Sequence, residues 1–164
     1  MTLAVYTYSP EEVDFIVSGY KITGWNSIAI SRMNAGFTHV AGVRGKNTRI
    51  RNRNSGATIF VDVVRTSPVN TVFSEIHRKD LIYGTGRLEI MIKDKQGGSL
   101  YSSIEAYIDK YPDDAFTTEM NNRRWTINCQ STNDWNVAGS EKAQESLYSR
   151  LTSGVADAID GFLN

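Results

Sequence analysis

The sequence is poor in cysteine and histidine and has no net charge. Its 164 residues include one cysteine and two histidines, and 18 basic side chains balance 18 acidic ones. A lone cysteine, Cys129, excludes an intramolecular disulfide and a cysteine-rich metal site. Zero net charge gives no global attraction to nucleic acid or to anionic membranes.

Long apolar runs are missing as well. No stretch approaches the roughly 20 apolar residues that cross a bilayer. Residues 1–12 lack the basic region and apolar core of a signal peptide. We therefore expect a protein made in the reducing cytoplasm of its host, with no membrane binding by the monomer. The length suits a single ordinary domain.

Period-two alternation of apolar and polar residues extends over most of the chain and predicts strands with one buried face. The clearest run is Leu88, Ile90 and Ile92. Turn residues follow the runs at short intervals, as antiparallel hairpins require, and we assign Gly84-Thr85-Gly86 to such a hairpin turn. Further strands are predicted at residues 13–17, 28–30, 57–63, 100–108 and 125–129.

Two segments have apolar residues three or four positions apart, which is helical spacing. The first predicted helix extends from Pro68 to about Leu81, because proline at the first helical position loses no needed hydrogen bond. Residues 9–12 also resemble a helix start, but the alternation after them predicts a strand instead. The second predicted helix extends from Glu141 to Phe162, with an apolar stripe formed by Leu147, Leu151, Val155, Ile159 and Phe162.

The second helix follows a linker-like stretch at residues 133–139. We therefore divide the chain into a β domain at residues 1–139 and a C-terminal helical extension at residues 140–164. Two roles stay open for the apolar stripe. It packs on the protein's own sheet, or it reaches a neighbouring subunit or partner as an amphipathic helix in a groove.

Candidate catalytic and metal-binding patterns have simpler explanations. Residues 42–48 have only two residues between their glycines, so they lack the spacing of a phosphate-binding loop and predict a turn between strands. His39 and His77 are far apart and have no carboxylate or cysteine nearby at ligand spacing. Cys129 lies on the apolar side of a predicted strand, which favours a buried, inert thiol. We predict no catalytic residue, metal site or cofactor, and no enzyme.

One stretch is strongly basic and contains no acidic residue. In an extended conformation, alternate residues share a face, so Arg49, Arg51 and Arg53 are expected on one side. Three interpretations stay open: a solvated hairpin tip, a docking surface for an acidic protein, and a ribbon that contacts phosphates. The residues of this basic run are Arg44, Lys46, Arg49, Arg51 and Arg53.

Turns and strand ends follow one another in a recognisable order between about residues 6 and 139. The ordered set consists of Ile22-Thr23-Gly24, Arg32, Phe37-Thr38, Gly42 to Gly45, Ser55-Gly56, Thr66-Ser67-Pro68-Val69-Asn70, Ile92-Lys93-Asp94, Tyr101, Glu105-Ala106 and Arg124 to Cys129. In this order the set resembles the tail tube proteins of contractile-tailed bacteriophages and their prophage relatives.

The resemblance implies a mainly β fold of two packed antiparallel sheets, sandwich- or barrel-like, with a flanking α-helix and here an added C-terminal α-helix. It implies that six subunits form a ring, that their inner sheets join into one β-barrel, and that rings stack into the inner tail tube of a virion. Implied partners are further copies of the chain, the tail sheath protein, the tape measure protein, and the baseplate and tail terminator proteins. Genomic DNA passes through transiently.

The resemblance also gives roles to the two unusual segments. The basic run is expected on an extended loop that docks the next ring, where Asp113, Asp114 or Glu119 could meet it. We do not expect its arginines to dominate the bore, because a cationic lumen would grip DNA. The C-terminal helix lies beyond the common family core and is expected on the tube exterior, against a neighbouring subunit or the sheath.

Two alternatives to a phage tail tube stay open. The same architecture serves the tube proteins of type VI secretion machines and phage-like bacteriocins. A different class is a small nucleic-acid-binding β-barrel that uses the ribbon from Arg49 to Arg53, for which salt-dependent retention of DNA by the monomer is expected.

Overall fold

The computed structural model describes residues 8–139 and Ser153, and it confirms the predicted mainly β fold with a flanking helix. The predicted C-terminal helix at 141–162, with its stripe of Leu147, Leu151, Val155, Ile159 and Phe162, lies outside the described residues. The helix and the domain division at residue 139 therefore stay predictions. The described elements are the 3-10 turn Pro10–Glu12, β1 (Val13–Val17), β2 (Tyr20–Lys21), β3 (Trp25–Arg32), β4 (Phe37–Ala41), β5 (Asn47–Arg51), β6 (Ala57–Val63), α1 (Val69–Tyr83), β7 (Leu88–Asp94), β8 (Leu100–Lys110), β9 (Arg123–Cys129) and β10 (Asp134–Asn136).

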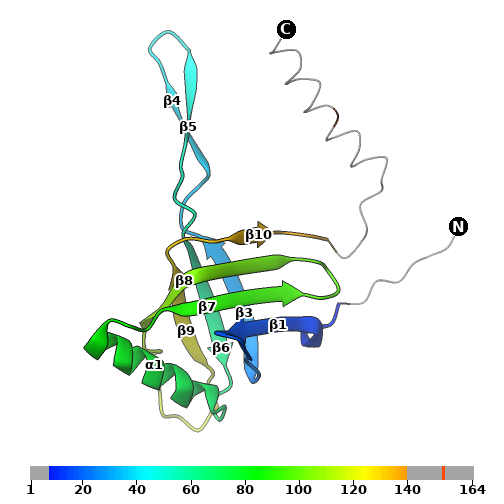
Figure 1. The fold of residues 1–164 in the computed structure, drawn as a ribbon, viewed down its shortest axis with the longest axis vertical. Helices are drawn as coiled ribbons and strands as arrows, with labels where there is room; N and C mark the ends of the chain where they lie inside the picture. Colours follow the sequence, from blue (N-terminus) through cyan, green and yellow to red (C-terminus); the bar gives the residue numbers. More distant parts are fainter. Residues whose placement is uncertain (1–7, 140–152, 154–164) are drawn as a thin grey trace, which may run out of the picture.

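One large antiparallel sheet has the strand order β2-β1-β7-β8-β9-β6-β3, and β10 pairs with β8 beside this path. In Figure 1, β1, β7 and β8 lie across β9, β6 and β3, so the sheet bends over and forms two layers. The two expected layers are therefore parts of one continuous sheet. The sheet does not close into a barrel within the described chain, because β3 and β2 stand at opposite ends of the strand order.

The core lies between the two layers and is built by alternation. On β6, every second side chain is buried, and β9 repeats the pattern opposite it. The large buried side chains include Phe15 from β1, Ile90 from β7 and Trp125 from β9. Burial of about 25 cal/mol per Å² of apolar surface makes this alternating face the main source of stability.

Helix α1 packs against one end of the sandwich. Phe73 on the helix meets Trp125 of β9 edge to face, with ring centroids 5.5 Å apart. The helix ends at Gly84, whose φ of 66° is left-handed and whose N–H donates to the Asp80 carbonyl at 2.8 Å. Glycine is favoured at such a C-cap because it has no Cβ to clash.

One prediction about a turn was wrong. Gly84-Thr85-Gly86 was expected to be a hairpin turn, but it joins α1 to β7, and the Asp80 carboxylate accepts a hydrogen bond from the Gly86 N–H at 2.8 Å. Glycine at positive φ serves helix ends and hairpins equally, so the residue alone does not separate them. At Pro10–Glu12 the chain makes a single 3-10 turn, and the strand predicted after it begins at Val13.

A buried asparagine joins three elements behind α1. The side-chain Nδ2 of Asn70 donates to the carbonyls of Val64, Arg65 and Ser67 at 3.0 to 3.2 Å. Its Oδ1 accepts a hydrogen bond from Trp125 Nε1 at 3.0 Å. The asparagine and tryptophan that the sequence comparison singled out are therefore one physical unit, which fixes the start of α1 to the end of β6 and to β9.

A candidate self-assembly surface

An arm formed by β4 and β5 leaves the sandwich between two neighbouring strands. β3 leads into it and β6 follows it, and these two strands pair directly with each other. Figure 1 shows the arm projecting from the sheet at the end away from α1. At its tip, the Gly42 N–H donates to the Lys46 carbonyl at 2.7 Å, and Gly45 has a φ of 80°. The turn predicted within residues 42–48 is confirmed.

The register of the arm gives it two chemically different faces, because directly opposed residues of an antiparallel pair lie on the same side. Phe37 is opposite Arg51, and His39 is opposite Arg49, so one face is aromatic and cationic. The Arg49 guanidinium lies 4.1 Å from the centroid of the Phe37 ring, a cation–π distance. The other face carries Thr38, Val40, Thr48 and Ile50.

Both faces of the arm are open to solvent. Phe37, Val40 and Ile50 have exposed fractions of 50%, 56% and 50%. The two strands form a sheet of their own, apart from the large one. A two-stranded hairpin alone is marginally stable in water at best. The arm therefore gains stability from any surface that covers one of its faces.

The residues of the basic run separate into two groups. Arg44 and Lys46 lie in the turn at the tip. A hollow of about 900 Å³ at the root of the arm is lined by the other three, Arg49, Arg51 and Arg53. These three arginines were expected on one side of an extended segment, and they do line one hollow. Arg53 reaches it from beyond the end of β5 at Arg51. None of the residues in the basic run forms an ion pair with a residue that the structure describes.

Arg32, at the end of β3, also lines the hollow and was missed as a site residue. Its Nη1 donates to the Ser55 carbonyl at 3.1 Å, and its guanidinium lies 4.4 Å from the centroid of the Trp135 ring. The sequence separates Arg32 from the basic run, and only the return of the chain from the arm to β6 brings them together. The hollow is therefore more cationic than the run alone indicates.

The loop between β8 and β9 lies at the other end of the molecule, beside α1 (Figure 1). Asp113 and Glu119 of this loop are exposed, and so are the apolar side chains of Phe116 and Met120. Lys110 is the nearest cation to Asp113, with Nζ 3.9 Å from Oδ1. Acidic and apolar groups at this end thus complement the basic and apolar groups of the arm.

Asp114, in the same loop, is already used within its own chain. Its Oδ1 lies 3.1 Å from Arg65 Nη1, and its Oδ2 lies 2.9 Å from Arg123 Nη2. The hydrogen bond from Arg123 holds the pKa of Asp114 below its ordinary value. Asp114 thus already has two cationic partners in its own chain, and the expected contact of Asp113, Asp114 or Glu119 with the basic run stays a prediction.

The outward face of β3, β6 and β9 is nearly free of charge. Its charged pair is Asp62 and Arg124, joined by two hydrogen bonds of 2.9 and 3.2 Å, and Ser27 donates to the same carboxylate at 2.7 Å. The bonds from Arg124 keep the pKa of Asp62 below its ordinary value. The other outward side chains are small or neutral: Ala29, Ser31, Thr58, Phe60, Thr126 and Asn128.

Strand edges of the large sheet are left unpaired within the described chain. β3 pairs with β6 on one side, and its other side has no partner strand among the described residues. β10 pairs with β8 and has no second partner strand among the described residues. Free edges offer rows of unpaired N–H and C=O groups and serve as templates for another chain.

The described residues show little else that carries chemistry. They contain no group of three or more His, Cys, Asp and Glu side chains placed to hold a metal ion. His39 lies on the arm, whereas His77 is on the buried face of α1, with its ring against Tyr111. Cys129 is buried, and its burial raises the pKa of the thiol, which fits the predicted inert cysteine. No described helix has the length and apolarity that a membrane crossing requires.

Comparison with known proteins identifies the family. No family model matches the chain. The chain is, however, 31% identical to structural protein ORF10 of Pseudomonas phage KPP10 over 158 residues, which cover 90% of this chain and 91% of ORF10. It belongs to this family of phage structural proteins. A structural role agrees with the prediction that the protein is not an enzyme.

Solved structures share the fold of this phage structural protein. A chain of the anti-feeding prophage cap, the tube terminating cap, superposes with a TM-score of 0.62 at 11% identity, over 83% of this chain and 96% of that one. A chain from the tail of an empty gene transfer agent particle, refined with C6 symmetry, has a TM-score of 0.56 at 13% identity, over 80% and 100%. The resemblance to tail tube proteins predicted from the sequence is thereby confirmed at the level of the family and the fold.

Proposed function

We propose that this phage structural protein is the subunit of the inner tail tube of a contractile tail, and that it forms hexameric rings stacked into a DNA-conducting channel. Its partners are further copies of itself, the sheath, the tape measure protein, and the baseplate and terminator proteins. The observation that carries the proposal is the arm, a ribbon whose two exposed faces are cationic and apolar. The loop between β8 and β9, with its acidic and apolar side chains, lies at the other end of the molecule.

Ring closure is supported by the unpaired strand edges. The eight residues of β3 offer a full-length edge, and a neighbour's strand would remove this aggregation hazard. The register of β3 shifts between Trp25 and Ser27, where a bulge leaves Asn26 outside the ladder. Bulges often end pairing at sheet edges, so the free run from Ser27 to Arg32 is the part that would pair with the next subunit.

Stacking is supported by the placement of opposite chemistry at opposite ends. An arm that docks on the far end of another copy makes a head-to-tail contact, and contacts of this kind generate rings or open filaments. In the stack, the basic face of the arm would meet Asp113 and Glu119, and its apolar face would cover Phe116 and Met120.

Passage of DNA is supported by the neutral face of β3, β6 and β9. Uncompensated arginines on a bore would release counterions from the DNA and bind it tightly. On this face Arg124 is neutralised by Asp62, and the remaining side chains are uncharged. We assign this face to the lumen, and a helical reconstruction of assembled tubes would show it there or contradict it.

Electron microscopy of the purified protein tests the proposal. We expect rings or hollow tubes once the concentration is raised, and antibody or mass-spectrometric detection of the chain in sheathed tails. A strictly monomeric protein at high concentration that is also missing from virions would end the assignment.

A tube-terminating cap is the second candidate, favoured by the TM-score of 0.62 to such a cap. A cap subunit forms one ring and then stops, whereas a tube subunit continues. The copy number of the chain per virion separates the two functions, because a tube needs many rings and a cap needs one. The phage relative favours a virion over a secretion machine or a bacteriocin, and the genes beside this one would test that choice.

A further inference from the structure

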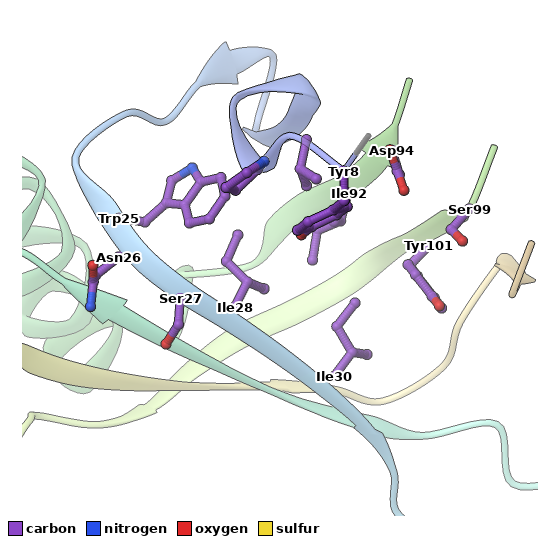
Figure 2. A pocket seen from close by; sticks show the side chains of 12 residues that line it. Tyr8, Trp25, Asn26, Ser27, Ile28, Ile30, Ile92, Asp94, Ser99 and Tyr101 are labelled. Atoms are coloured by element: carbon purple, nitrogen blue, oxygen red, sulfur yellow. The ribbon is translucent and has the colours of Figure 1, made fainter. Parts of the chain in front are cut away.

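A groove of about 430 Å³ opens where the two layers of the large sheet diverge. Figure 2 shows side chains of β3 along one wall and side chains of β7 and β8 along the other. Trp25, Ile28 and Ile30 form the β3 wall, and Ile92 and Tyr101 lie opposite them. The groove therefore opens onto the hydrophobic core, and its rim also carries the polar side chains of Asn26, Asp94 and Ser99.

The walls of the groove are incompletely covered. Ile92 is buried, but Trp25, Ile28, Ile30 and Tyr101 are only partly buried although they pack against the core. Large apolar side chains that line an open concavity mark a site where another apolar segment packs. The groove thus calls for an occupant with several apolar side chains in a row.

The continuously described chain ends at the rim of this groove. The Trp135 ring of β10 meets the Tyr101 ring edge to face at 4.9 Å. Beyond β10, the Ala138 N–H donates to Ser99 Oγ at 3.0 Å, and Ser99 Oγ donates to the Ala138 carbonyl at 3.2 Å. Ser99 and Tyr101 both line the groove. The continuously described part of the chain therefore stops directly beside the groove.

The remaining C-terminal segment has the required composition. Residues 140–164 are 25 residues long (164 − 139), and their predicted stripe supplies Leu147, Leu151, Val155, Ile159 and Phe162. A short tether raises the effective concentration of a segment at its own site to the millimolar range.

We propose that the apolar stripe of residues 140–164 docks into the groove between β3 and β7–β8 of its own chain and completes the core. The groove supplies the apolar walls, and the hydrogen bonds between Ser99 and Ala138 fix the point of entry. This intramolecular site does not depend on the tube proposal, because it exists in the monomer.

Disulfide trapping in the full-length chain tests the docking. The native cysteine is buried, so engineered pairs can be followed cleanly. In monomer isolated by size-exclusion chromatography, the variant Ile28→Cys with Leu151→Cys should form an intramolecular disulfide. The matched control is Ile28→Cys with Ser149→Cys, since Ser149 lies opposite the stripe on a helix. We expect cross-linking of the first pair to be faster by roughly tenfold or more, because the tether is the same and only the docked face differs.

Other results would overturn the proposal. Equal rates for the two pairs would show a tethered but undocked segment. A ladder of disulfide-linked dimers would place the stripe in the groove of a neighbour. Faster trapping of Ile28→Cys with Val5→Cys would make residues 1–7 the occupant, since Tyr8 and Pro10 also line the groove. Deleting residues 140–164 should increase binding of a hydrophobic dye to the monomer several-fold, and unchanged dye binding would likewise contradict docking.

Discussion

The junction behind α1 and the arm of β4 and β5 use polar groups in opposite ways. At the junction, Asn70 makes four hydrogen bonds inside the chain, and Trp125 is almost fully buried. On the arm, both faces are exposed and the cations form no ion pair with a described residue. The junction is complete in one subunit, whereas the proposed stacking would cover the arm only in an assembly. Stability and assembly should therefore respond to separate sets of substitutions.

Charge reversal on the arm is expected to have the largest effect. The variant Arg49→Glu with Arg51→Glu should abolish tube polymerisation, because it places acidic groups opposite Asp113 and Glu119 of the next copy. Sedimentation and electron microscopy measure the assembly, and circular dichroism should show an unchanged fold. The variant Arg49→Lys with Arg51→Lys keeps the charge and should retain most assembly. If the charge-reversed variant gave as many tubes as the wild type, the proposal that the arm docks on the next copy would be contradicted.

Removal of Asn70 tests the other region. Asn70→Ala leaves Trp125 Nε1 and three carbonyls without their partner, so the free energy of unfolding should fall by about 2–4 kcal/mol. Urea denaturation followed by tryptophan fluorescence measures this loss. Asn121→Ala, at an exposed position of the β8–β9 loop, is the control and should change stability by less than about 0.5 kcal/mol. Equal losses in both variants would mean that the buried network is dispensable.

The apolar face of the arm sharpens the comparison further. Val40→Ser with Ile50→Ser should lower the yield of tubes several-fold while the free energy of unfolding of the monomer changes by less than about 0.5 kcal/mol, because both side chains are already exposed. Ile127→Ala in the core should do the reverse and cost about 2–5 kcal/mol. If the serine variant assembled normally, only the basic face of the arm would be in contact.

Acid should weaken the sandwich modestly. Hydrogen bonds from Lys21 and, to a smaller extent, Lys95 lower the pKa of Asp14. In the same way, Arg124 lowers the pKa of Asp62, and Arg123 lowers the pKa of Asp114. A carboxyl group whose pKa is lower in the folded chain than in the unfolded chain stabilises the fold at any pH above the unfolded pKa, near 3.9 for Asp. This stabilisation is lost as the pH falls through the pKa of the folded chain. The thermal midpoint of the monomer should therefore decline below about pH 4 and be flat between pH 5 and 7. A midpoint that rises on acidification would contradict these ion pairs.

Local patterns predicted the elements with one buried face. Alternation located Leu88–Asp94 and Ala57–Val63, and helical spacing located Val69–Tyr83 to within two residues, because burial on one side imposes a period on the sequence. The arm has no buried side, so alternation predicted a shared face for Arg49 and Arg51 but did not locate the strands β4 and β5.

Contacts between distant residues could not be read from such patterns. Asp114 was predicted only as a contact for the basic run, and its pairing with Arg65, 49 positions earlier (114 − 65), is seen only in the fold. Arg32 joins the basic hollow for the same reason. Residues 84–86 show the remaining limit, since the same glycines suit a helix end and a hairpin.

The arm begins and ends on two strands that are hydrogen-bonded to each other. Its length can therefore change, two residues at a time, without altering any pairing in the sandwich. Lengthening or trimming the ribbon would alter the reach between neighbouring copies and leave the folding unit intact. Insertion or deletion at this single place in the chain is therefore compatible with every strand pairing of the sandwich.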